Sequence, residues 1–152
     1  MFAERIFPHA VGRVWSVFAA GEGAHAWAFR VPGYRGVPGN QFDLMYLPIL
    51  GTRFTGRFRC ELTRFQPSHT WECRTVATVK YGATADWVNR VELTDHSQGT
   101  LVRWALSGTN LTDGHERVLY RVYTGHVRKT LGDLGRYLDQ NPHSERLYQP
   151  RL

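Results

Sequence analysis

Between residues 53 and 107, successive segments alternate apolar and polar side chains, and this alternation constrains the fold more than any other feature. In residues 53–64, Phe54, Phe58 and Leu62 share one parity, whereas arginine, threonine and glutamate occupy most positions of the other. Successive side chains of a β-strand point to opposite faces of its sheet. The pattern therefore predicts an antiparallel sheet with one apolar, aromatic face and one face of arginine and glutamate in water.

Turn-forming sequences divide this region into strands of similar length. The separators LPILG, QPSH, KYGA and DHSQG are short and contain the Gly, Pro, Asp and Ser residues that form turns. The expected strands number six or seven and span residues 2–7, 29–34 (short), 40–47, 52–65, 69–79, 84–94 and 100–109. Strands joined by such short turns indicate an antiparallel meander.

The pairing of neighbouring strands can be predicted by matching apolar faces. If Phe65 pairs with Thr70, then Cys60 lies opposite Thr75. A five-residue connection at 80–84 keeps the next pair in phase and places Thr75 opposite Asn89. One face of the sheet is therefore apolar along all the central strands.

Helical periodicity marks the end of the chain. From Asp113 to about Gln140, apolar residues recur on one stripe of an expected helix: Tyr120, Tyr123, Val127, Leu131, Leu134 and Leu138. Asp113 and Glu116, three residues apart, fit a capping box at its start. Two short helices are expected after the first strand, one over residues 11–18 and a second near 22–28.

The size and composition indicate one globular domain. We expect residues 1–140 to form a single domain and 141–152 a C-terminal tail. The beginning of the chain has no apolar segment of the kind found in signal peptides, and no apolar run is long enough to span a membrane. Because Cys60 and Cys73 suit a reducing compartment as free thiols, we expect a cytoplasmic protein.

The formal net charge of +6 comes almost entirely from arginine, with 17 Arg against two Lys. These arginines alternate along strands and the back of the long helix and form no basic run, so we expect no nucleic-acid partner. The seven histidines lack the spacings of metal sites, and no glycine motif of a nucleotide site is present. We therefore expect no metal and no cofactor. The sequence does not decide between a monomer and a homodimer.

The order of strand, two short helices, meander and long helix resembles the START/birch-pollen-allergen-like helix-grip superfamily, with its polyketide cyclase/dehydrase and lipid transport group. The resemblance rests on IFPHAVGRVWSVFA (6–19), Trp27, FRCELTRFQPSHTWEC (58–73), GTLVRWAL (99–106) and the helix 115–139. It implies an α+β fold in which a curved antiparallel sheet grips a long C-terminal helix, with space for a ligand between them. It implies no particular chemistry, because the superfamily has no short catalytic motif.

Our leading functional hypothesis is a protein that binds a small hydrophobic or aromatic molecule, such as a lipid, polyketide or similar metabolite, in that space. The inward-facing residues expected to bind it are Phe54, Phe58, Trp71, Thr75, Trp87, Trp104, Tyr120, Val127 and Leu131. The loops 47–51, 80–83 and 110–114 are expected at one end of the sheet, where the apolar LPIL segment either covers a cavity mouth or packs onto the short helices.

Two alternatives remain open. An enzyme of the cyclase/dehydratase type would use Tyr123, His126 or Asn89 to hold and move protons. Each of these residues also has a purely structural interpretation, as a core tyrosine, a surface histidine or a satisfied core amide. A ligand-free regulatory interaction module would instead act through the arginine-rich face of the sheet.

Overall fold

A computed structural model of the chain describes residues 2–19, 31, 33–82 and 85–141. The expected second short helix near 22–28 and the tail 142–152 lie outside these residues. The described helices and strands, in chain order, are β1 (Phe2–Phe7), α1 (Val11–Phe18), β2 (Gln41–Met45), β3 (Phe54–Gln66), β4 (Thr70–Val79), β5 (Asp86–His96), β6 (Gly99–Ser107) and α3 (Gly114–Gln140).

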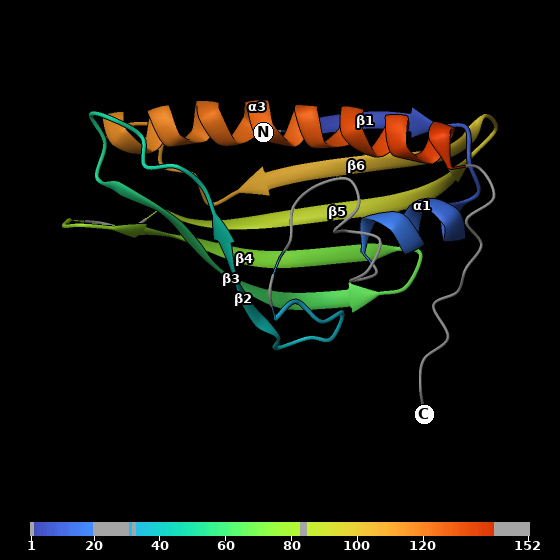
Figure 1. Cartoon of the computed structure of the whole chain (residues 1–152), viewed down its shortest axis with the longest axis horizontal. Helices are drawn as coiled ribbons and strands as arrows, with labels where there is room; N and C mark the ends of the chain where they lie inside the picture. The colour runs from blue at the N-terminus through green and yellow to red at the C-terminus, as the bar shows by residue number, and fades with distance from the viewer. Residues whose placement is uncertain (1, 20–30, 32, 83–84, 142–152) are drawn as a thin grey trace.

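The fold is α+β, with a curved sheet of six antiparallel strands in the order β1-β6-β5-β4-β3-β2. Figure 1 shows α3 running along the length of the sheet, with α1 near the end of α3 that is drawn in red. This arrangement confirms the predicted sheet and long helix. In the described part of 29–34, Val31, Gly33 and Tyr34 belong to no strand. Within the described residues, no helix is both long and apolar enough to cross a membrane.

The register is partly as expected. Cys60 lies opposite Thr75, as predicted, but Phe65 pairs with Trp71 instead of Thr70. An irregularity between Leu62 and Arg64 inserts one residue into β3, and this bulge shifts the end of the hairpin. The predicted pairing of Thr75 with Asn89 is wrong.

The second error is a shift of two residues. Asn89 pairs with Cys73, and Thr75 pairs with Trp87. A shift by two positions keeps every side chain on its predicted face, because the side-chain period of a strand is two. The predicted apolar face is therefore correct, although the predicted register is not.

The long helix packs its predicted stripe against the sheet. Tyr123, Val127, Leu131, Leu134 and Leu138 of that stripe are buried, and Tyr120 is half-buried beside the buried Leu119. The carboxylate of Asp113 accepts hydrogen bonds from the backbone N–H groups of His115 and Glu116, which are otherwise unpaired at a helix start. The reciprocal half of the predicted capping box is absent, because the Glu116 carboxylate binds Trp87 and the backbone of Asn110 instead.

Candidate functional site

Aromatic side chains of the protein itself fill the space between α3 and the middle of the sheet. Phe58 is 1% exposed, and its ring centroid lies 4.8 Å from that of Phe54, 5.5 Å from Tyr123 and 5.9 Å from Trp87. Trp87 is fully buried. Interiors packed in this way have little free volume. The rings expected to line a ligand cavity here are in contact with one another.

A polar network crosses this interior. The Asn89 side-chain carbonyl accepts hydrogen bonds from the Trp104 indole N–H at 2.9 Å and the Tyr123 hydroxyl at 3.0 Å. The Asn89 amide donates to the Thr75 hydroxyl at 3.0 Å. Asn89 is fully buried and Thr75 is 1% exposed, so these bonds form away from water. The network ties β4, β5 and β6 to α3.

A second aromatic group lies beside α1. The ring of Phe18 contacts Trp71 and Trp104 edge-on, at centroid distances of 5.9 and 5.8 Å. The Trp71 indole N–H donates to the Tyr34 hydroxyl at 3.1 Å. Burial raises the pKa of Tyr34 to about 12, so this hydroxyl stays protonated at neutral pH. Trp104 thus links this group to the Asn89 network.

The structure brings together two of the three residues considered for catalysis. Tyr123 donates to Asn89, and burial raises the pKa of Tyr123 well above its usual value. His126 lies elsewhere, with its ring edge-on to Tyr46 at 5.3 Å and its Nε2 3.2 Å from the Thr130 hydroxyl. Burial lowers the pKa of His126, which favours the neutral imidazole.

Tyr46 was missed by the sequence analysis. Its ring also contacts Phe58 at 5.4 Å, and burial raises its pKa. It follows β2 directly and precedes the LPIL segment. Only its apolar surroundings in the sequence could have indicated its burial.

A cavity of about 190 Å³ lies where α3 begins, at the ends of β3, β4 and β5, and it is partly open to solvent. We call it the end pocket. Its apolar lining comes from Phe54, Val79, Ala85 and Leu119, of which Phe54, Ala85 and Leu119 are buried. It lies at the end of the sheet where the loops 80–83 and 110–114 were expected.

The polar lining of the end pocket includes Arg53, Asp86, Asp113, His115 and Glu116. Arg53 forms an ion pair with Asp113 at 3.1 Å. The hydrogen bond from the backbone N–H of Glu116 lowers the pKa of Asp113 most, and the hydrogen bond from Arg53 lowers it further. The carboxylate of Asp86 is engaged by Arg74, which lies on the outer face of the sheet and lowers the pKa of Asp86.

Glu116 is held by two neutral donors. Its Oε1 accepts from the Trp87 indole N–H and from the backbone N–H of Asn110, each at 2.7 Å. Among the described residues, no hydrogen bond reaches its second oxygen, Oε2. Trp87 belongs to the packed interior, so this contact connects the interior to the end pocket. The sequence indicated Glu116 only as part of a helix cap.

Of the residues expected to bind a ligand, Phe54 lines the end pocket. Phe58, Thr75, Trp87, Trp104, Val127 and Leu131 are buried in the interior, and Trp71 and Tyr120 are half-buried against it. The expected binding face is thus one continuous surface, and the end pocket lies at its edge.

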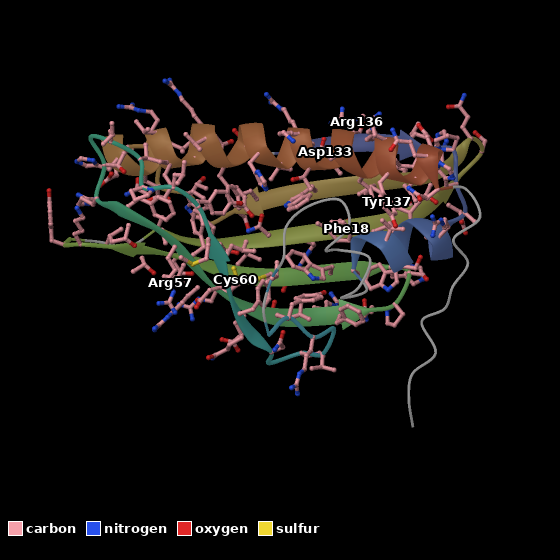
Figure 2. All side chains as sticks on the ribbon, viewed as in Figure 1. Phe18, Arg57, Cys60, Asp133, Arg136 and Tyr137 are labelled. Atoms are coloured by element: carbon pink, nitrogen blue, oxygen red, sulfur yellow. The ribbon has the colours of Figure 1, made fainter. Side chains whose placement is uncertain are left out.

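The outer face of the sheet carries paired charges. Arg57 bonds to Asp43, Arg90 to Glu72 and Arg103 to Glu4. Figure 2 shows Arg57 projecting from this face. Because each of these arginines has a carboxylate partner, the face is more balanced than the net charge of the chain suggests.

Cys60 and Cys73 are free thiols and are buried. In the described ranges, no three His, Cys, Asp or Glu side chains are grouped so that they could hold a metal ion.

Solved structures share this fold at low sequence identity. Protein MLL2253 from Mesorhizobium loti is 18% identical, with a TM-score of 0.72 over 92% of this chain and 96% of its own. CalU16 from Micromonospora echinospora is 19% identical, with a TM-score of 0.66 over 90% of this chain and 74% of its own. DynU16, a protein in the dynemicin biosynthetic locus, is 17% identical, with a TM-score of 0.69 over 91% of this chain and 46% of its own.

No family model matches the sequence, and no curated protein matches it either. At these identities the structural likeness shows the helix-grip fold alone.

Proposed function

We propose that this protein binds a small molecule with an apolar or aromatic part in the end pocket. The observation that carries the proposal is the cavity of about 190 Å³ between the start of α3 and the sheet, with an apolar inner lining. An apolar cavity of about 150 Å³ is large enough to hold benzene. The end pocket therefore suits one aromatic ring or a short chain, and is too small for a whole lipid.

The packed interior supports this position of the ligand. With Phe58 and Trp87 in contact, a ligand deeper between the sheet and α3 would have to displace rings that stabilise the fold by roughly 1.5–3 kcal/mol each. In the end pocket, a ligand displaces solvent only. Phe54 is then the predicted residue that contacts the ligand, and Phe58 and Trp87 continue the aromatic packing behind it.

The similarity to DynU16, which is encoded in a biosynthetic locus, is in keeping with a small-molecule ligand. We also propose that the chain belongs to the START/birch-pollen-allergen-like superfamily, because the element order and the grip of the sheet on α3 agree with it. Ligand binding between sheet and helix is what that membership implies.

Filling the end pocket tests the proposal. Leu119 is 5% exposed and lines the pocket, so Leu119→Trp places an indole where the ligand would lie. We expect wild-type protein to bind 2-phenylethanol saturably in a calorimetric titration, and Leu119→Trp to weaken binding at least about tenfold, or 1.4 kcal/mol.

The matched control is Val118→Trp. Val118 is the neighbouring residue on α3 and is 40% exposed, so the same substitution there adds an indole outside the pocket. Circular dichroism of both variants checks that they fold. Equal affinity of wild type and Leu119→Trp, or no saturable binding by the wild type, would contradict the proposal.

A further inference from the structure

The charges around the end pocket leave one carboxylate uncompensated. Arg53 and Asp113 neutralise each other, and Asp86 is paired with Arg74 on the outer face. His115 lies exposed at the rim. Glu116 is bound by an indole and a backbone N–H, and neither of these carries a charge. Among the residues that line the pocket, Glu116 is therefore the carboxylate without a charged partner, although the chain as a whole carries +6.

The hydrogen-bonding groups of the pocket point to the same preference. The first free backbone N–H groups of α3 bind Asp113, so the helix start has little left to offer an anion. The guanidinium of Arg53 is engaged by Asp113 through Nη2, and its Nε atom is buried against Gly82 with no hydrogen-bond partner among the described residues. Among the described residues, Oε2 of Glu116 accepts no hydrogen bond, and it is held in place through Oε1. The pocket thus presents an oriented acceptor beside an apolar wall.

We propose that the ligand is a small cationic amphiphile, such as a primary amine attached to an aromatic ring or short alkyl chain, whose ammonium group binds Glu116. This inference rests on the proposed function and specifies its ligand class. The ring or chain contacts Phe54, Val79 and Leu119, and the ammonium replaces solvent at Oε2 of Glu116. A charge-assisted hydrogen bond in a half-buried site is stronger than a neutral one.

Three probes of similar size and different charge test this preference: 2-phenylethylamine as cation, 2-phenylethanol as neutral compound and phenylacetate as anion. We expect the wild type to bind the amine about ten- to a hundredfold more tightly than the alcohol, and phenylacetate more weakly than both. Binding of the amine should weaken as the salt concentration rises, whereas binding of the alcohol should not.

Glu116→Gln keeps an oxygen for Trp87 and Asn110 and replaces the free oxygen and the charge by an amide. We expect this variant to lose the preference for the amine and to bind the alcohol as the wild type does. The matched control is Glu92→Gln on the exposed face of β5, which changes the total charge equally and should keep the preference.

The outcomes separate the two proposals. Equal affinity for amine and alcohol in the wild type, or an amine preference that survives Glu116→Gln, overturns the cationic ligand class. If Leu119→Trp still blocks the probes in that case, the proposed pocket stands. If none of the three probes binds saturably, both proposals are wrong.

Discussion

Replacing Asn89 by leucine is expected to lower the free energy of unfolding by about 4 kcal/mol. The substitution removes the partner of the Trp104 indole, the Tyr123 hydroxyl and the Thr75 hydroxyl. Each buried donor or acceptor left without a partner costs about 1–3 kcal/mol, and burial of the leucine offsets part of that cost. Urea unfolding followed by tryptophan fluorescence measures the change.

Tyr123→Phe is the control for this network. It removes one hydroxyl and leaves the bond between Asn89 and Trp104 in place, so its expected cost is about 1 kcal/mol. If Asn89→Leu lowers the free energy of unfolding by no more than Tyr123→Phe does, the hydrogen bonds of Asn89 do not all form in solution. Asn89 would then have spare hydrogen-bonding capacity for a ligand or a reaction.

Replacing Phe58 by alanine is expected to lower the free energy of unfolding by about 4 kcal/mol, within the usual range for a buried phenylalanine. Phe58 is 1% exposed and its ring contacts Phe54, Tyr46, Tyr123 and Trp87. The lost ring should leave a cavity between β3 and α3. We expect benzene to raise the melting temperature of this variant more than that of the wild type, because the variant offers this new cavity in addition to the end pocket.

The matched control is Arg59→Ala, one residue further along β3 on the exposed face, with an expected change below about 0.5 kcal/mol. A cost of Phe58→Ala below about 1 kcal/mol would contradict the packed interior. The space between sheet and helix would then be loose enough for a ligand, as the sequence analysis expected.

The sheet and α3 were predictable because their periodicities are long and regular. The stripe from Tyr123 to Leu138 and the alternation along β3 to β6 correctly assigned the buried faces. Register was less certain, because the bulge between Leu62 and Arg64 leaves no clear mark in the sequence. The register between β4 and β5 was also predicted wrongly, because a two-residue shift preserves the alternation that was used to align the two strands.

The inward face of β1 could not be assigned from the positions of its apolar residues. Phe2 and Ile6 share one parity and resemble the apolar side, but Phe2 is 59% exposed, whereas Phe7 is 1% exposed. The inward side also holds Arg5, whose guanidinium lies over the ring of Phe7 at 5.5 Å and beside Gly135 of α3. Arg5 is exposed although it shares the parity of Phe7, so this side of β1 carries little apolar signal in the sequence.

The candidate site was less predictable than the fold. An aromatic inward face is compatible with a cavity and with a packed core, and parity does not distinguish them. The end pocket forms where strand ends and the start of a helix meet, so its residues share no period. Glu116 shows this: its spacing from Asp113 indicated a cap, whereas its carboxylate is directed to Trp87 and Asn110 by tertiary contacts.

The most direct test of the binding site is measurement of intermolecular nuclear Overhauser effects between bound 2-phenylethylamine and the protein's methyl groups. If the end pocket binds the ligand, the ring protons give signals to Leu119, Val79 and Ala85, which line it. Signals to Val127 and Leu131 without signals to those three residues would place the ligand in the interior and contradict the account.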